Sequence, residues 1–147
     1  MFINNKNKQF SEMDNNDIME LHRVCNQGGI RKSNRTQSFV LIMNHRIAKY
    51  EDKTDNSRFE IKYDGAFTTG KTNQLMTNMN MALANTKWPL HVYERKRESH
   101  RILYDYVGVY ENQGIPAKTI RDGRIVYVYT LRRITPTVTY DFDTFEF

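Results

Sequence analysis

Apolar residues alternate or cluster along the chain in patterns that predict β-strands. Residues 58–63 (RFEIKY) alternate strictly, with Phe59, Ile61 and Tyr63 on one face, which predicts a half-buried strand. Residues 38–43 (SFVLIM) are continuously apolar over the length of one strand and are expected to be buried on both faces. Further strands are expected over residues 90–94, 103–110 and 125–132, and the alternating tail 136–147 is expected to be an edge strand or a domain boundary.

Two segments instead have the spacing of amphipathic helices. The first begins near residue 16 and ends before Gly28 and Gly29, and its apolar positions are Ile18, Leu21, Val24 and Cys25. The second is expected to begin with Thr72 as its N-cap and to end near Asn85. Its apolar positions are Leu75, Met79, Ala82 and Leu83.

Five or six strands with two helices define an α+β, mostly β fold. We expect a curled, mostly antiparallel sheet or small barrel with the helices on its outside. The length of 147 residues predicts a single domain, with a core over about residues 16–134. Residues 1–10 are a polar lead-in, and residues 30–36 (IRKSNRT) are expected to form a basic loop.

Composition narrows the class of protein. Cys25 is the one cysteine, so neither a disulfide nor a zinc site is expected to stabilise the fold. No apolar run is long enough to span a bilayer, and the first ten residues lack a secretory signal, so a cytoplasmic protein is expected. The net charge of +5 favours a polyanionic partner, although modestly.

Two tyrosines lie beside carboxylates, in Tyr50-Glu51-Asp52 and Tyr63-Asp64-Gly65. Aromatic rings with nearby carboxylate acceptors can stack on a nucleobase and accept hydrogen bonds from its exocyclic amine. Spacing alone favours an ordinary role, in which both are strand-end tyrosines with buried rings and hydrated hydroxyls.

A series of motifs in a defined order favours the base-binding interpretation. The series comprises VLIMNHRIAKYEDK, FEIKYDGAFTTGKTNQLMTNMNMAL, LHVYE, YDYVGVY and VYVYTLRR, preceded by GGIRKSN. Over about residues 28–134 the chain thereby resembles the SRA domain, also called YDG. The similarity is to the version fused to HNH nucleases in bacterial modification-dependent restriction enzymes.

This resemblance implies a PUA-like barrel that flips a modified cytosine, of the 5-methyl or 5-hydroxymethyl class, out of duplex DNA. Tyr50 and Tyr63 would sandwich the base, and Asp52, or Asp55 in its place, would accept a hydrogen bond from its amine. The backbone around Gly65 would complete the pocket. Asp64 departs from the family, which commonly has threonine there, and could read a hydroxyl or sugar on the modification.

Basic residues flank the proposed base pocket and are expected to contact DNA phosphates. The expected DNA-backbone contacts are Arg31, Lys32, Ser33, Arg35, Arg46, Lys49 and Lys71. A second basic group, in a turn holding Arg95, Lys96, Arg97 and Arg101, is expected to matter less.

We expect a binding domain without catalytic residues, cofactor or metal. Its partners would be DNA carrying modified cytosine and a nuclease domain or subunit of a restriction system. A homodimer is a further possible assembly. Two alternatives remain from the residues alone. Asp52, Asp55 and Asp64 could serve a metal-dependent nuclease, or a PUA-like pocket could bind single-stranded RNA.

Overall fold

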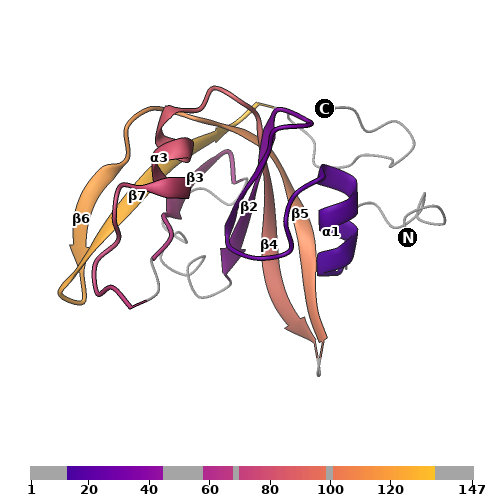
Figure 1. Ribbon diagram of the computed structural model, residues 1–147, viewed down its shortest axis with the longest axis horizontal. Coiled ribbons are helices and arrows are strands. Elements are labelled where there is room, and N and C mark those ends of the chain that lie inside the picture. Colours follow the sequence, from indigo (N-terminus) through magenta and orange to yellow (C-terminus); the bar gives the residue numbers. More distant parts are fainter. Residues whose placement is uncertain (1–12, 45–57, 68–69, 99–100, 135–147) are drawn as a thin grey trace.

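The structure is a computed structural model that describes residues 13–44, 58–67, 70–98 and 101–134 (Figure 1). These residues form two helices and seven strands. The helices are α1 (Asn15–His22) and α3 (Asn78–Asn85). The strands are β1 (Ile30–Ser33), β2 (Ser38–Asn44), β3 (Glu60–Asp64), β4 (Leu90–Glu98), β5 (Arg101–Asn112), β6 (Ala117–Arg121) and β7 (Arg124–Arg133).

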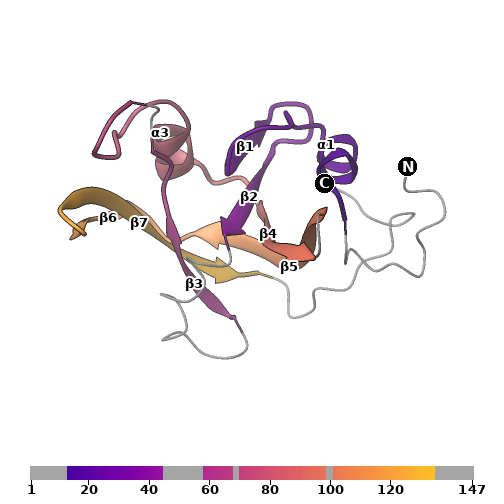
Figure 2. The ribbon, with the colours of Figure 1, turned by 90° about the horizontal axis from the view of Figure 1, so that it is seen from below.

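The seven strands form one sheet, in the order β1-β2-β4-β5-β7-β3, with β6 paired to β7. β2 and β4 are parallel, and the other strand pairs are antiparallel. The sheet curls into a half-barrel, so that the β6–β7 hairpin lies apart from β1 and β2 (Figures 1 and 2). The predicted α+β, mostly β fold with a curled sheet and two flanking helices is confirmed.

The central strand β2 is buried on both faces, as its continuous apolar sequence predicts. Phe39, Leu41 and Met43 belong to the core cluster that also includes Leu83 of α3. Val40 points to the opposite face and packs in a second cluster with Ile18 of α1. The two helices therefore cover opposite faces of the sheet.

Helix α1 begins at a reciprocal capping box. The side chain of Asp14 accepts a hydrogen bond from the backbone N–H of Asp17 at 2.8 Å, and the Asp17 carboxylate accepts one from the N–H of Asp14 at 3.1 Å. The helix ends at Arg23, whose backbone is left-handed at φ 58°. The last helical residue, His22, therefore lies three residues before Cys25, the last apolar position of the predicted helix.

Two strands were not expected from the sequence. The predicted basic loop 30–36 instead begins with β1, which pairs with β2 from Ile30↔Leu41 to Ser33↔Ser38. β6, which pairs with β7, lies in the expected connection between the last two strands. Both strands are short and mostly polar, IRKS in β1 and AKTIR in β6, so neither shows the apolar alternation that marks β3 in the sequence.

Two other expectations were wrong in detail. α3 begins after Thr77 rather than Thr72, because residues 73 and 74 bond to the start of β7 instead of entering a helix. Leu75 is accordingly 37% exposed. Phe59 was expected on the buried face but precedes β3, which begins at Glu60, and it is 48% exposed.

Several residues of the sequence interpretation lie outside the described ranges. They are Arg46, Lys49, Tyr50, Asp52 and Asp55 of the proposed site, together with the lead-in 1–10 and the tail 136–147. In the described part of the chain, no helix is both long and apolar enough to cross a membrane.

Candidate nucleic-acid pocket

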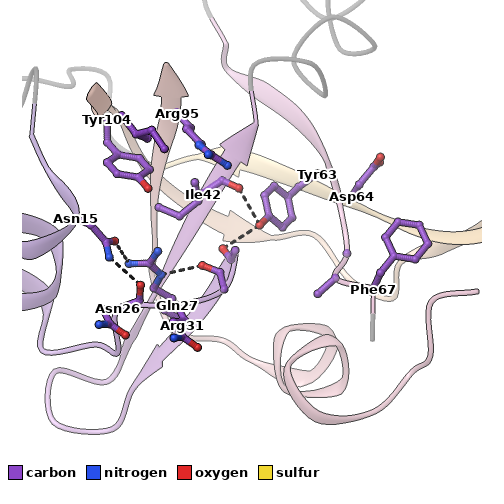
Figure 3. A pocket seen from close by; sticks show the side chains of 15 residues that line it. Asn15, Asn26, Gln27, Arg31, Ile42, Tyr63, Asp64, Phe67, Arg95 and Tyr104 are labelled. Carbon is purple, nitrogen blue, oxygen red and sulfur yellow. Dashed lines mark hydrogen bonds between the residues drawn. The ribbon is translucent and has the colours of Figure 1, made fainter. Parts of the chain in front are cut away.

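A cavity of about 730 Å³ opens where the end of β3 faces the glycine loop before β1 (Figure 3). Six parts of the fold line it: α1, the loop 26–29, β1, β2, the segment 63–67 and the β4–β5 hairpin. The described lining residues are Asn15, Asn26, Gln27, Gly28, Gly29, Arg31, Ile42, Tyr63, Asp64, Gly65, Ala66, Phe67, Arg95, Ile102 and Tyr104. Tyr63, Asp64 and Gly65 were predicted from the sequence to share one pocket. All three border this cavity.

Tyr63 forms one wall of the cavity. It follows Ile61 on the core face of β3 and is only 3% exposed. Its hydroxyl donates hydrogen bonds to the backbone carbonyls of Gly29 at 2.9 Å and Ile42 at 3.2 Å. These bonds anchor the hydroxyl end of the side chain, which holds the ring in a fixed position at the cavity wall.

Gly65 continues the wall after Tyr63 and lies close to other polar groups. Its N–H donates to the carbonyl of Tyr127 at 2.8 Å, and its carbonyl accepts from the Gln74 amide at 2.6 Å. A Cβ atom at this position would lie 2.7 Å from Oδ1 of Asn80. Only glycine fits without displacing that side chain, which gives a physical reason for glycine in the Tyr-x-Gly motif.

Asn80 of α3 holds the segment after Gly65 in place. Its Oδ1 accepts from the N–H of Ala66 at 2.8 Å, while its Nδ2 donates to the carbonyls of Ala66 at 2.8 Å and Leu75 at 2.9 Å. Asn80 begins the motif Asn80-Met81-Ala82-Leu83, which lies in the quoted run FEIKYDGAFTTGKTNQLMTNMNMAL, and Leu83 at its end packs into the core. The motif thus fixes the helix and the cavity wall together.

Arg31 is buried beside the glycine loop. It is 4% exposed, and its guanidinium donates to the carbonyl of Gly28 at 2.8 Å and to Oδ1 of Asn15 at 2.7 Å. Asn15 in turn donates from Nδ2 to the carbonyl of Asn26 at 2.7 Å. Arg31 was expected to contact phosphate, and these bonds give it a clear internal role in shaping the cavity floor (Figure 3).

The carboxylate of Asp64 points away from the ring of Tyr63, because neighbouring residues of a strand face opposite sides (Figure 3). It forms an ion pair with Arg121 of β6. Burial raises the pKa of Asp64, while the hydrogen bond and positive charge of Arg121 oppose that rise. The carboxylate therefore already has a cationic partner within the fold.

The remaining proposed DNA-backbone contacts differ in exposure. Lys32, Arg35 and Lys71 are exposed, and the Lys32 ammonium lies 5.5 Å from the ring centre of Trp88. Ser33, by contrast, is 1% exposed, and its hydroxyl accepts from the N–H of Thr36 at 3.1 Å. Ser33 shapes the β1–β2 turn, and the three exposed cations remain available to a polyanion.

Several cavity residues were not expected from the sequence. Arg95 borders the cavity from within β4, which extends to Glu98, so its predicted place in a basic turn was wrong. Tyr104 and Ile102 face the cavity from the adjacent strand β5. Asn15, Asn26 and Gln27 had no motif to mark them. For Asn15 alone the sequence holds a local indication of its position, because the N-cap residue Asp14 directly precedes it.

Within the described ranges, no group of three or more His, Cys, Asp or Glu side chains is arranged to hold a metal ion. Of the three aspartates considered for a metal-dependent nuclease, Asp64 is described, and it pairs with Arg121. The cavity's chemistry is instead that of an aromatic wall, amides and guanidinium groups.

The curled sheet, with helices on opposite faces, a tyrosine wall and a glycine turn, has a PUA-like architecture. Solved structures make the fold more specific, since it is that of the SRA domain. The SRA domain of SUVH5 in complex with fully methylated CG DNA is 24% identical, with a TM-score of 0.57 over 85% of this chain and 84% of that one. The SUVH5 SRA domain bound to fully hydroxymethylated CG DNA is also 24% identical, with a TM-score of 0.56 over the same shares.

A third solved structure shares the fold over part of its own length. The DNA modification-dependent restriction endonuclease AspBHI is 15% identical, with a TM-score of 0.62 over 86% of this chain and 39% of that one. No family model matches this sequence, and no curated protein does. At these identities the likeness concerns the fold, and the predicted resemblance to SRA domains is confirmed at that level.

Proposed function

We propose that this chain binds duplex DNA carrying a modified cytosine and holds the modified base, flipped out of the helix, in the cavity beside Tyr63. The observation that carries the proposal is the rigid ring of Tyr63 beside the close-packed turn at Gly65 in a cavity of about 730 Å³. A flipped base needs an aromatic surface and backbone polar groups at one site, and this wall supplies both.

Tyr50 and Asp52 complete the proposed site on the strength of the sequence resemblance. Tyr50 would stack on the second face of the base, and Asp52 would accept a hydrogen bond from its amine. Asp64 belongs to the wall through its place between Tyr63 and Gly65. Stacking and hydrogen bonding would offset the few kcal/mol that unstacking a base costs.

The exposed cations Lys32, Arg35 and Lys71 would contact phosphates, with Arg46 and Lys49 added from the sequence. Arg31 and Ser33 would support those contacts by fixing the backbone of the loop. Because cation–phosphate contacts release counterions, affinity should fall as salt increases. Each lost contact should reduce the slope of log affinity against log salt by roughly 0.9.

The similarity to 39% of a DNA modification-dependent restriction endonuclease supports a role as the specificity domain of a larger protein. The proposed function is recognition, and a nuclease domain elsewhere in the protein or system would cut the DNA. The chain would act in the cytoplasm, as a monomer or a homodimer.

A binding panel tests this proposal. Matched duplexes carrying cytosine, 5-methylcytosine or 5-hydroxymethylcytosine at one position are titrated at fixed salt, with 2-aminopurine beside the target base to report unstacking. We expect at least one modified duplex to bind about tenfold more tightly than the unmodified one, with a rise in fluorescence.

Tyr63→Ala and Tyr50→Ala should each abolish that preference. Phe59→Ala is the matched control, because Phe59 is an exposed aromatic residue that does not line the cavity. Equal affinity for every duplex, or an unchanged preference in both tyrosine variants, would refute the proposal. A single-stranded RNA competitor at the same salt separates it from RNA binding.

A further inference from the structure

Strand β6 has an edge that pairs with no other strand in the described part of the chain. It pairs with β7 alone and lies at the outer limit of the sheet (Figures 1 and 2). Such an edge presents backbone N–H and C=O groups that can pair with another chain. The terminal strands β1 and β3 differ, because their isoleucines, Ile30 and Ile61, are buried, whereas Ile120 of β6 is 74% exposed.

The turn of the β6–β7 hairpin determines which backbone groups of β6 face this outer edge. Asp122 and Gly123 have positive φ values of 54° and 72°, as a two-residue hairpin turn requires. The residues that flank the turn, Arg121 and Arg124, are paired with each other. In a two-residue hairpin the flanking pair is hydrogen-bonded, and bonded and non-bonded pairs then alternate along the ladder.

This alternation directs the backbone groups of Ile120 and Lys118 away from β7. Ile120 lies opposite Ile125, next to the flanking pair, so these two residues exchange no ladder hydrogen bond. Lys118 lies opposite Tyr127 in the equivalent position. The N–H groups of Ile125 and Tyr127 accordingly donate to side chains of residues 73–74 on the other side of β7, at 2.8 and 2.7 Å. The N–H and C=O groups of Ile120 and Lys118 therefore point outward.

The outward groups of β6 are self-complementary. A second copy of the strand can lie antiparallel to the first, with a two-fold axis through the Thr119 positions. Lys118 of each copy then lies opposite Ile120 of the other, and each such pair exchanges both of its N–H···O=C bonds. Thr119 lies opposite its own counterpart between the two bonded pairs. Every outward backbone group of Lys118 and Ile120 is satisfied in this register.

The side chains of β6 fit the same register. Lys118 would lie opposite Ile120 of the second copy, and its aliphatic stem can cover that exposed side chain. Arg121 would lie opposite Ala117 of the second copy, so no two cations of β6 oppose each other directly. An axis at Lys118 would instead place two lysines opposite each other, which is unfavourable.

We propose that two copies of this chain pair through the outer edge of β6, with Thr119 on the two-fold axis, to form a homodimer with one continuous sheet. This inference concerns assembly and does not rest on the proposed DNA binding. A five-residue edge buries less surface than a standard interface of about 1,200–2,000 Å². The dimer should therefore be weak, and its population should depend on protein concentration.

Sedimentation velocity of the full chain between about 1 and 100 µM tests for the dimer. We expect the mass to rise from that of one chain toward twice that value. Ile120→Lys places a lysine opposite Lys118 and should weaken dimerisation by about fivefold, whereas Ile120→Glu places a carboxylate there and should strengthen it. Ile134→Lys, at an exposed isoleucine beyond the far end of β7, is the control and should change nothing.

Thr119→Cys in a Cys25→Ser background tests the register itself. Thr119 and its counterpart would be a directly opposed pair with Cα atoms about 4.5 Å apart, within the reach of a disulfide. We expect oxidation to give a covalent dimer on non-reducing electrophoresis. Ile120→Cys in the same background is the matched control, because its counterpart lies diagonally across the axis, about 7–8 Å away.

A single-chain mass at every concentration, or species larger than a dimer, would overturn the proposal. Equal weakening by Ile120→Lys and Ile120→Glu, or equal crosslinking of the two cysteine variants, would overturn the register with Thr119 on the axis. Duplex binding by the wild-type chain is measured separately, so failure of the dimer and failure of the proposed function are distinguishable.

Discussion

The hydroxyl of Tyr63 donates a hydrogen bond to the backbone carbonyl of Gly29, 2.9 Å away, and so joins the end of β3 to the loop before β1. A Cβ atom on Gly29 would lie 3.1 Å from that hydroxyl, which explains the small residue there. The same hydroxyl lies 3.2 Å from the carbonyl of Ile42 on β2. One side chain thus connects three parts of the cavity wall that are distant in sequence.

Tyr63→Phe removes the hydroxyl and keeps the ring. We expect the free energy of unfolding to fall by about 1 kcal/mol, because the two carbonyls lose a donor in a buried place. Urea unfolding followed by circular dichroism measures this. Affinity for the preferred duplex should stay within a few-fold of the wild type, whereas Tyr63→Ala should lose it. Equal loss of binding in both variants would show that the hydroxyl itself contacts the DNA.

Asn80→Ala removes three hydrogen bonds that hold residues 66 and 75. Since Asn80 is buried and leaves backbone groups unsatisfied, unfolding free energy should fall by about 2–4 kcal/mol. Amide exchange should also accelerate around Ala66. Asn85→Ala is the control on the same helix, because Asn85 is exposed and bonds only to Met81 in that helix; its change should stay within about 0.5 kcal/mol.

Arg121→Ala leaves the Asp64 carboxylate without its cation. Without the hydrogen bond and charge of Arg121 to oppose it, burial raises the pKa of Asp64 further above the ordinary value of 3.8. The folded state would bind a proton more tightly than the unfolded state, so stability should decrease as pH rises through 4 and above.

At pH 7 the loss in unfolding free energy should be about 2 kcal/mol, and adding Asp64→Asn should restore most of it. Urea midpoints of the two single variants and the double variant provide the measurement. Asp64→Asn alone should leave the ranking of modified duplexes unchanged, because Arg121 already engages the carboxylate. A changed ranking would instead assign the carboxylate to base reading.

His22 and His91 form a buried polar pair between α1 and the sheet, with ring centres 4.6 Å apart. His22 shares a hydrogen bond of 2.6 Å with the Tyr93 hydroxyl, and His91 shares one of 3.0 Å with that of Tyr106. Burial lowers the pKa of His91 from 6.5 to about 3, and burial and then the charge of His91 lower the pKa of His22.

Because the folded state disfavours protonation, these histidines stabilise the fold fully above pH 6.5, and that stability is lost as pH falls toward 3. His91 alone should contribute a loss on the order of 1.4 kcal/mol for each pH unit below 6.5. Urea midpoints between pH 7.5 and 4.5 and proton uptake on unfolding measure this effect. His91→Gln should remove about one of the protons taken up; an unchanged uptake would contradict the assignment.

The pattern of apolar and polar residues along the chain was enough to predict most of the strands and which side chains of β3 face the core. The continuous run 38–43 is buried on both faces because α1 and α3 cover opposite sides of β2. The alternation of Ile61 and Tyr63 placed that tyrosine inward. The motifs at Gly65 and Asn80 were also visible in the sequence, and both prove to be parts of one hydrogen-bonded turn.

The sequence by itself therefore determined the fold class, the inward tyrosine and the glycine turn, since these depend on residues close together in the chain. Tertiary structure alone decided that Arg31 turns inward to Asn15, that Asp64 pairs with Arg121, and that Arg95 borders the cavity. Each of these relationships joins separate elements across the curled sheet. Local periodicity reports which face a residue occupies, and it carries no information on the distant partner that the fold brings against that face.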